Sequence, residues 1–417
     1  MKCFRNLFTL FRGRLLLPLI LINVIIFITF FYSFFSTRPE HLVEHGHQDI
    51  EPSPQLRVKQ PIAKPLILMW TRIFTKQTMQ LGSDCPLASL CEFTYDHSFL
   101  PNSSAVVFHI PDIKWHFSHS LPGVPDLPHQ SGNVQRVNVF MSHENPTTLK
   151  TMYKSEALAK HVHNFFHWAM TYVRASHVPF PYGGYWLSPV ETKRLGFTPV
   201  QLPSDSNTIL QNKTKRGILW LVSNCKANSK REAAVEALSK YINIKIGGKC
   251  GKTPADRNLC PRSSDCSYLY SNYYFYIAIE NDICNNYVSE KFWERYMLPA
   301  VPIVLKASIY QGFVPDNSFI AMDQFKSPKQ MADHLNLLMD NPNEYLKYFE
   351  WRSKGWSVAP YNHEGFRVGP CALCERLLRL SNGSDLFPSP IPNAVKWFEE
   401  NSNCEGGDFA VQWSQQK

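Results

Sequence analysis

The sequence FYIAIEN at residues 275–281, followed by YVSEK at residues 287–291, is the stretch that decides the fold. The run from Phe275 to Ile279 is short and apolar, which is typical of a buried strand, and Ser289 is a residue type that commonly caps a helix. Polar residues that follow a strand of an open α/β sheet lie at its carboxyl edge, where ligands bind. We therefore expect a binding site there, formed by Glu280, Asn281, Tyr287, Glu290 and Lys291.

The residue types at this predicted edge favour a nucleotide diphosphate sugar as the ligand. The N-terminus of a helix attracts anions, and Lys291 adds a full positive charge. A carboxylate such as Glu290 can hold the hydroxyl groups of a ribose. The alternative is a capped surface helix that carries an ordinary Glu–Lys pair.

Short apolar runs alternate with helix-like stretches in two series, which predicts parallel α/β sheets. The first series has strands at 65–70, 105–110 and 137–141 and a helix at about 155–172. The second has strands at 217–222, 242–246, 275–279, 301–305 and 319–322, with helices at 229–241, at 289–297 and from 327 onward. We expect an α/β fold of two Rossmann-like lobes, residues 65–214 and 215–370, with an interlobe cleft that binds ligands.

The N-terminal residues predict a membrane anchor. Residues 15–35 form an almost unbroken apolar run of the length that spans a bilayer as a transmembrane helix. Positive charges precede the run, which predicts a cytoplasmic tail at 1–14 and a luminal catalytic part. A cleaved signal peptide is the alternative, but the bulky residues 32–35 do not suit cleavage. Residues 36–64 are polar and contain prolines, so we expect an extended stem.

The composition agrees with a folded luminal protein. Hydrophobic residues make up 44% of the 417 residues and aromatic residues 13%, which excludes a mainly disordered chain. The net charge of +9 suits a phosphorylated ligand or an acidic membrane surface, and the absence of a basic run with interleaved aromatics argues against nucleic acid. Ten of the eleven cysteines follow the apolar run, as in an oxidising lumen. N-glycosylation sequons begin at Asn102, Asn212 and Asn382.

The stretch at 275–291 resembles the signature of the α1,3-fucosyltransferase family, glycosyltransferase family 10. That signature reads roughly F-Y-x-A-x-E-N and then Y-x-T-E-K, and here Ser289 replaces the threonine. Further segments look like the same family in the same order. They are 222–224 with 228–231, then 301–305, 319–320 and 348–352, so that the resemblance covers roughly residues 65–400.

The resemblance implies a GT-B fold and a reaction that inverts the anomeric centre of GDP-fucose. Arg231 and Lys291 would face the diphosphate, and these two fixed cations would stabilise the departing GDP. The chain has no Asp-x-Asp motif, so we expect no metal cofactor for the chemistry and a divalent cation to be at most stimulatory. The donor-binding residues implied in this way are Ser223, Asn224, Arg231, Tyr276, Glu280, Asn281, Tyr287, Glu290 and Lys291.

An inverting reaction needs a base that takes the proton of the acceptor. The segment SHENP at 142–146 resembles the family segment that supplies it, with Asn145 in place of serine. We assign Glu144 as the general base, which partial burial would make more effective by raising its pKa. The alternatives are His143 as the base and a Glu144 that merely caps the loop.

The segment FFHWAMTY at 165–172 resembles an aromatic family motif on the acceptor side. Trp168 and Tyr172 are its candidate acceptor-side residues, and packing in the lobe core is an equally good reading of each. His163 and His167 are four residues apart on the predicted helix, a spacing that can bind zinc. The sequence shows no third ligand, so no metal site is expected.

The motif Cys371-x-x-Cys374 would by itself fit a zinc knuckle or a redox site, but no second such motif exists and the predicted compartment favours disulfides. The resemblance implies that both cysteines pair with two cysteines of the N-terminal lobe, for which Cys85 and Cys91 are the candidates. Residues 371–417 are therefore expected to return to that lobe. The pairing of the other cysteines, Cys225, Cys250, Cys260, Cys266, Cys284 and Cys404, stays open.

We expect a fucosyltransferase on the Golgi membrane, type II in orientation, that acts at the 3-hydroxyl of N-acetylglucosamine in glycoprotein or glycolipid glycans. Lactosamine, LacdiNAc and the N-glycan core remain open as acceptors, as does a homodimer. One alternative is a catalytically silent, membrane-anchored glycan-binding protein on the same fold. A luminal sulfotransferase is a weaker alternative, because residues 69–74 show no phosphosulfate-binding loop. Lys306 stands where the family usually has glycine and is expected to alter donor affinity.

Overall fold

A computed structural model describes residues 64–82, 85–116, 123–128, 135–194, 205–261, 264–312, 314–360 and 368–417. The chain divides into two compact units, 1–59 and 60–417, and all described residues belong to the second. The predicted cytoplasmic tail, anchor and nearly all of the stem lie outside the described residues. Within the described residues no helix is long and apolar enough to cross a membrane.

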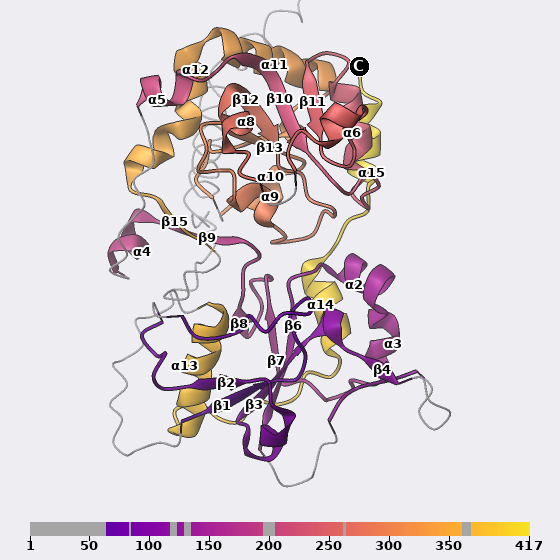
Figure 1. The fold of residues 1–417 in the computed structure, drawn as a ribbon, viewed down its shortest axis with the longest axis vertical. Coiled ribbons are helices and arrows are strands. Elements are labelled where there is room, and N and C mark those ends of the chain that lie inside the picture. Colours follow the sequence, from indigo (N-terminus) through magenta and orange to yellow (C-terminus); the bar gives the residue numbers. More distant parts are fainter. Residues whose placement is uncertain are drawn as a thin grey trace, which may run out of the picture. The chain divides into compact units, whose positions relative to one another are not determined.

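The first sheet has six parallel strands in the order β2-β1-β3-β6-β7-β8 (Figure 1). Its central strands are fully buried and almost entirely apolar, as parallel strands covered on both faces are. The strands are β1 (Leu66–Met69), β2 (Glu92–Thr94), β3 (Ala105–His109), β6 (Val137–Ser142), β7 (Trp168–Thr171) and β8 (Val178–Pro179).

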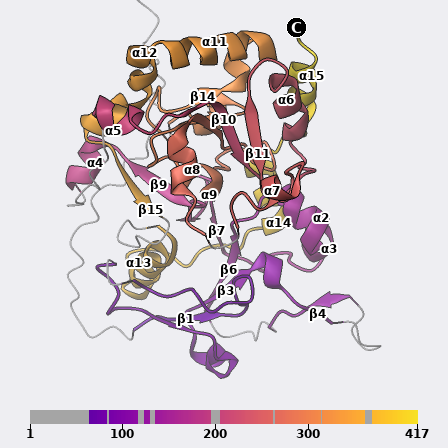
Figure 2. The ribbon, with the colours of Figure 1, turned by 45° about the horizontal axis from the view of Figure 1, so that its top comes forward.

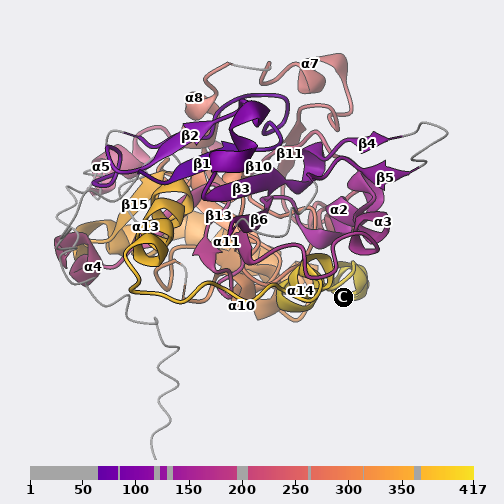
Figure 3. The same ribbon diagram turned by 90° about the horizontal axis from the view of Figure 1, so that it is seen from below.

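Two helices from the C-terminal part of the chain cover opposite faces of this sheet (Figure 3). Val107 and Met141 face α13 (Gly369–Ser381), whereas Val106 and Phe140 face α14 (Ala394–Ser402). The short helices α2 (Pro146–Tyr153) and α3 (Ser155–Ala159) pack on the same side as α14. The first lobe is therefore completed by the C-terminal part of the chain.

The second sheet has five parallel strands in the order β11-β10-β12-β13-β14. Gly217 has φ +130 there, and a Cβ atom would lie 2.4 Å from the carbonyl oxygen of Asn243, so glycine is required where β10 meets its neighbour. The strands are β10 (Lys215–Leu221), β11 (Ile244–Gly247), β12 (Tyr273–Ile277), β13 (Val301–Val304) and β14 (Ile320–Ala321).

Three helices pack side by side against the core of the second sheet (Figure 2). They are α6 (Arg231–Leu238), α11 (Pro328–Asp340) and the last helix, α15 (Asp408–Ser414). Residues 371–417 were expected to return to the first lobe, but their last part does not, because α15 packs on α6 of the second lobe. The chain end crosses back to the second lobe after α14.

Shorter elements connect the two sheets and their helices. The helical ones are η1 (His97–Asn102), η2 (Ile110–Asp112), α4 (Pro189–Arg194), α5 (Ser206–Leu210), α7 (Pro254–Arg257), α8 (Ser267–Asn272), α9 (Glu290–Trp293), α10 (Ala307–Tyr310), η3 (Met322–Gln324), α12 (Pro342–Leu346) and η4 (Lys347–Lys354). Two antiparallel pairs join β4 (Trp115–His116) to β5 (Val124–Pro125) and β9 (Gly184–Leu187) to β15 (Ser357–Pro360).

The predicted helix over 155–172 is wrong. Only α3 is helical, and the segment ends in the buried strand β7. Two buried pairs of side chains pack on opposite faces of the sheet, Phe165 and Phe166 on one and Trp168 and Met170 on the other. Such an apolar run has the same pattern as a buried helix, which is why the sequence predicted one. His163 and His167 are accordingly not on one helix. The described residues contain no group of three His, Cys, Asp or Glu side chains suited to a metal ion.

Five disulfides join all ten cysteines in the described part of the chain. Cys371 and Cys374 lie on one side of α13. Cys371 is bonded to Cys85 and Cys374 to Cys91, and both partners belong to loops of the first lobe. Cys284–Cys404 ties the loop after β12 to the segment before α15. Two further bridges, Cys225–Cys250 and Cys260–Cys266, lie within the second lobe.

Candidate active site

Glu280 organises the carboxyl edge of the second sheet. Its carboxylate is 4% exposed and accepts hydrogen bonds from the backbone N–H of Ser289 at 2.7 Å and from the Ser289 hydroxyl at 2.7 and 2.8 Å. Lys291 Nζ donates to it at 2.9 Å. Glu280 therefore fixes the beginning of α9 from the end of β12. Its three hydrogen-bond donors, the Ser289 N–H, the Ser289 hydroxyl and the Lys291 ammonium, give it a positioning role.

Lys291 lies between two carboxylates. Besides Glu280, its ammonium reaches the Ser289 hydroxyl at 2.7 Å and Glu290 Oε1 at 3.3 Å. Burial lowers the pKa of Lys291, but the charges of Glu280 and Glu290 outweigh burial and leave the pKa above its ordinary value. Lys291 is therefore a fixed positive charge at the beginning of α9.

Arg231 is more deeply buried than the predicted role implies. It is 2% exposed, and its guanidinium donates to the carbonyl oxygens of Ile279 at 2.6 Å and Asn224 at 3.0 Å. Burial lowers its pKa, partly offset by the charge of Glu280. Arg231 thus ties the loop after β10, where Ser223 and Asn224 are exposed, to the end of β12.

Two acceptor atoms at this edge lack a partner. Among the described residues, no group donates a hydrogen bond to the buried Asn281 Oδ1 or to the buried Glu290 Oε2. An unsatisfied buried acceptor costs about 1–3 kcal/mol, so such atoms in a native fold need an explanation. Hydroxyl groups of a ligand are donors of the kind that these two atoms lack.

Glu144 lies two residues after β6 of the first lobe, and the charges of Lys291, Glu290 and Glu280 of the second lobe act on it. Asn145, not Glu144, caps α2, because its side chain accepts from the N–H of Thr148 at 2.9 Å. Burial raises the pKa of Glu144, Lys291 opposes that rise, and Glu290 and Glu280 add to it. Tyr182 donates a hydrogen bond to the carboxylate. The structure therefore brings the predicted base of one lobe within electrostatic reach of the predicted donor residues of the other.

His143 is unsuited to the role of base. It is buried against the rings of Phe180 and Tyr182, with centroid distances of 4.0 and 5.2 Å. Burial, followed by the nearby His109, lowers the pKa of His143 to about 3. A neutral imidazole with so low a pKa is a weak base at neutral pH.

Tyr287 connects the two lobes through aromatic contacts. Its buried ring lies 5.1 Å from that of Tyr172 and 5.9 Å from that of Tyr182. Burial raises the pKa of Tyr287 well above its ordinary value, and Glu144 and Glu280 add to the rise. The hydroxyl of Tyr172 lies 3.3 Å from that of Ser402 in α14. Tyr172 and Tyr287 therefore sit beside the site.

Two predicted residues lie elsewhere. Tyr276 is buried in the core of the second sheet, where its hydroxyl donates to the carbonyl oxygen of Phe292 at 3.3 Å. Trp168 is buried among side chains beneath α13, with the guanidinium of Arg376 5.4 Å from its ring. Both side chains stabilise a lobe core, which is the packing role that the sequence left open for Trp168.

Sequence reasoning did not assign two residues at the junction of the lobes. Gly183 has φ +103, and a Cβ atom there would lie 2.8 Å from the backbone nitrogen of Glu290, so only glycine allows this approach. Asp282 is buried, accepts a 2.5 Å hydrogen bond from Asn228 and faces Asn145 and Thr147 at the beginning of α2. The glycine pair at 183–184 could have indicated a close approach of two backbones, whereas no motif in the sequence indicates a role for Asp282.

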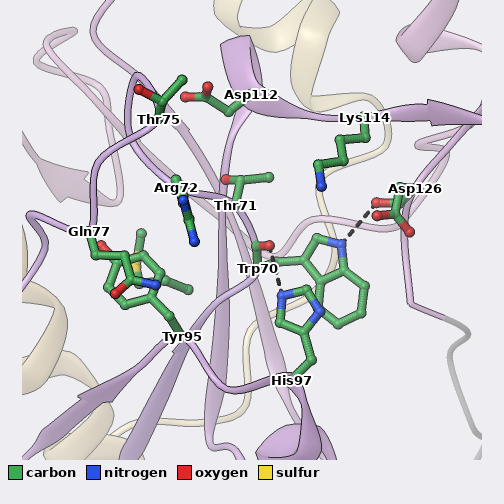
Figure 4. Close-up of a pocket in the computed structure, with 11 residues that line it drawn as sticks. Trp70, Thr71, Arg72, Thr75, Gln77, Tyr95, His97, Asp112, Lys114 and Asp126 are labelled. Carbon is green, nitrogen blue, oxygen red and sulfur yellow. Dashed lines mark hydrogen bonds between the residues drawn. The ribbon is translucent and has the colours of Figure 1, made fainter.

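A pocket of about 530 Å³ opens at the carboxyl end of β1, in the first lobe (Figure 4). The rings of Trp70 and His97 stack there with centroids 4.0 Å apart and planes 6° from parallel. Trp70 Nε1 donates to the carbonyl oxygen of Asp126 at 2.9 Å. The other lining residues are Met69, Thr71, Arg72, Thr75, Gln77, Tyr95, Asp112 and Lys114.

Comparison with known families identifies matches to both lobes. Residues 62–183 match the model described as "Fucosyltransferase, N-terminal", and residues 210–389 match "Glycosyltransferase family 10 (fucosyltransferase) C-term".

Curated relatives and solved structures are similar along most of the described chain. The α-(1,3)-fucosyltransferase fut-5 of Caenorhabditis elegans is 31% identical over 79% of this chain and 81% of its own length. The α-(1,3)-fucosyltransferase fut-1 of the same organism is 32% identical over 70% of this chain, which spans only 59% of that relative. A crystal structure of an α1,3-fucosyltransferase with GDP-fucose is 16% identical, with TM-score 0.48, over 81% of this chain and 96% of the other.

Proposed function

This chain belongs to glycosyltransferase family 10, the fucosyltransferases, and we propose that it transfers L-fucose from GDP-fucose in α1,3 linkage to N-acetylglucosamine of glycoprotein or glycolipid glycans. The names of its relatives support fucose transfer. The proposed enzyme is of GT-B type, with the donor held by the second lobe and the acceptor by the first. Its cleft lies between the carboxyl edges of the two sheets.

One observation carries this proposal: Glu144 of the first lobe interacts electrostatically with Lys291, Glu290 and Glu280 of the second. An inverting transfer needs a base and a charge-stabilising group on opposite sides of the reacting carbon. Glu144 takes the proton of the acceptor hydroxyl, whose oxygen forms a bond to the fucose C1 while the bond from C1 to the GDP oxygen breaks. Lys291 stabilises the negative charge that develops on GDP.

The unpaired acceptors at the second lobe suit the donor. Asn281 Oδ1 and Glu290 Oε2 can accept hydrogen bonds from the hydroxyl groups of ribose or fucose. Arg231 contributes by holding the loop with Ser223 and Asn224 in place, and by adding a positive charge near Glu280. In this proposal the fixed cations act without a resident metal ion.

We further propose a type II orientation in the Golgi membrane, with residues 15–35 as the anchor. Five disulfides suit an oxidising compartment. The asparagines of the three sequons, Asn102, Asn212 and Asn382, are all exposed, as glycosylation requires.

Incubation of the full-length protein with GDP-fucose and a panel of lactosamine, LacdiNAc and N-glycan core acceptors tests the activity. Fucosylated product is expected for at least one of them. Glu144→Gln should keep GDP binding and lose at least 99% of transfer, about the hundredfold or greater effect of removing a general base. Glu156→Gln, an exposed glutamate of the neighbouring α3, is the matched control. Glycan binding without any transfer would instead support the silent glycan-binding protein.

A further inference from the structure

Asp282 is a buried carboxylate with polar partners in both lobes. It follows Asn281 at the carboxyl edge of the second sheet and is only 3% exposed. It accepts a 2.5 Å hydrogen bond from Asn228, in the loop between β10 and α6, and the side chains of Asn145 and Thr147 in the first lobe also interact with it. Burial raises the pKa of Asp282 above its ordinary value, although these three side chains oppose the rise. One carboxylate therefore joins segments of the two lobes.

The partners of Asp282 in the first lobe belong to the beginning of α2. Asn145 caps this helix, and its Oδ1 accepts from the N–H of Thr148 at 2.9 Å. Because Oδ1 serves the cap, Nδ2 of the same side chain is left for Asp282. This nitrogen is buried and makes no well-formed hydrogen bond within the described residues, so its interaction with the carboxylate is what partly satisfies it. A carboxylate at this place also faces the positive end of the helix dipole.

The loop that carries Asp282 has a fixed path. The N–H of Asn285 donates to the carbonyl oxygen of Ser402, in α14, at 2.7 Å. The disulfide from Cys284 to Cys404 fastens the same loop to the segment that follows α14. The carboxylate of Asp282 is therefore a fixed point against which the beginning of α2 is placed.

We propose that Asp282 is a positioning residue for fucose transfer, which sets the distance between the general base and the donor across the cleft. Glu144 immediately precedes Asn145, and Asn281, with its unpaired Oδ1, immediately precedes Asp282. A shift at this junction therefore moves the base relative to the fucose C1. A misplacement of about 1 Å can lower a rate by about a hundredfold. The inference rests on the proposed function and adds to it a residue that acts through its neighbours.

An exchange of the two partners tests this role in the full-length protein. Asp282→Asn removes the charge, and Asn145→Asp places two carboxylates opposite each other while keeping a residue type that caps helices. Each variant should lose about tenfold or more in kcat for transfer to the best acceptor of the panel. The double variant Asn145→Asp/Asp282→Asn restores an amide opposite a carboxylate, in reversed order, and should recover most of the lost rate. The affinity for GDP, measured by calorimetry, should stay nearly unchanged in all three.

Rates are compared on the pH plateau of each variant, because a carboxylate at position 145 also raises the pKa of the neighbouring Glu144. Asp333→Asn is the control, since Asp333 is an exposed aspartate of α11 that pairs with Lys329, and its kcat should equal that of the wild type. Melting temperatures verify that the variants fold. If Asp282→Asn does not fold, the comparison of Asn145→Asp with the double variant decides.

Two results would overturn the positioning role. The first is a double variant that is no faster than Asn145→Asp, or single variants with the kcat of the wild type. The second is a loss of GDP affinity in Asp282→Asn with an unchanged kcat, which would confine the effect of Asp282 to the donor lobe.

The positioning role and the proposed function fail in different ways. Transfer by the wild type without recovery in the double variant leaves the fucosyltransferase intact and removes only the role of Asp282. If the wild type fucosylates no acceptor, the proposed function fails, and hydrogen exchange then tests the junction by itself. The N–H groups of α2 should exchange faster in Asp282→Asn and regain protection in the double variant. Equal exchange in all variants would rule out the junction as well.

Discussion

Lys306 and Glu405 form an ion pair in which Lys306 Nζ lies 2.6 Å from Glu405 Oε2. Lys306 lies two residues after the end of β13, and Glu405 belongs to the segment that the Cys284–Cys404 disulfide holds beside the second sheet. The N–H of Glu405 also donates to the carbonyl oxygen of Ile283 at 2.7 Å. The ammonium of Lys306 is therefore directed at the chain end. Its position does not support the expectation that it alters donor affinity.

Lys306→Gly should consequently leave the donor site nearly unchanged. The ion pair is partly exposed, at 21% and 52% for its two side chains, so its loss should cost at most about 1 kcal/mol. The KM for GDP-fucose should change less than about twofold, since the ammonium of Lys306 is already paired with Glu405 in a weak, partly exposed ion pair. Initial rates at varied GDP-fucose check this. A large rise in KM would show that Lys306 contacts the donor.

Lys291→Met and Glu290→Gln should shift the acid limb of the pH–rate profile in opposite directions. Glu144 acts as a base only when ionised, and burial raises its pKa, so the rate should fall at a pH above the ordinary 4.5. Removal of Lys291 removes an interaction that lowers this pKa, and the limb should move to higher pH. Removal of the Glu290 charge should move it to lower pH. The measurement is kcat at saturating GDP-fucose. Shifts of the same sign in both variants would contradict the assignment.

His143 should make the protein less stable in acid. Its pKa is about 3 in the folded state and 6.5 ordinarily, so the unfolded chain binds the additional proton between these values. The stability that the neutral ring contributes is complete above pH 6.5 and decreases by about 1.4 kcal/mol per pH unit as the pH falls toward 3. His143→Phe should flatten this dependence, as measured by melting temperature between pH 7 and pH 5. If the melting temperature of the variant falls with pH as steeply as that of the wild type, a group other than His143 takes up the proton on unfolding.

Lys213→Met should destabilise the second lobe. The half-buried ammonium of Lys213 donates to the carbonyl oxygens of Ser271 at 3.1 Å, Tyr273 at 2.5 Å and Pro299. Loss of this donor removes one hydrogen bond from each of three backbone carbonyls, at a cost of about 2 kcal/mol or more. The substitution keeps the sequon that begins at Asn212. Denaturant unfolding measures the change.

Lys347→Met is the control for Lys213→Met, because Lys347 is exposed and, among the described residues, its ammonium pairs only with Glu344. It should change stability by at most about 0.5 kcal/mol. If both variants lose a similar free energy of unfolding, the hydrogen bonds from Lys213 to the backbone carbonyls do not stabilise the lobe more than an exposed ion pair does.

Much of the fold could be predicted from local patterns. The strands β1, β3, β6, β10 and β13 lie within two residues of their predicted bounds, because short apolar runs between polar residues are distinctive in parallel sheets. Ser289 and Ser327 cap helices as predicted. The one large error, at 155–172, arose where an apolar run faces both sides of a sheet, which periodicity alone cannot distinguish from a buried helix.

The candidate site was harder to predict, because a motif does not say which way a side chain points. The side chain of Tyr276 points from its strand into the hydrophobic core of the second lobe and is buried there. Arg231 turns toward backbone carbonyls that no sequence pattern reveals. The role of Asp282 at the junction depends on its position beside Asn145 and Thr147 of the other lobe, which are far from it in the sequence. Such long-range pairings depend on tertiary packing.

The bridges from Cys85 to Cys371 and from Cys91 to Cys374 close covalent rings that span 286 and 283 residues. A protease that cuts once between Cys91 and Cys371 would leave both fragments attached to each other. Nicked molecules would migrate as one band in non-reducing electrophoresis and as two bands after treatment with thiol. Preparations of this protein that look uniform without reductant can therefore contain broken chains, and their shelf life should be judged on reduced samples.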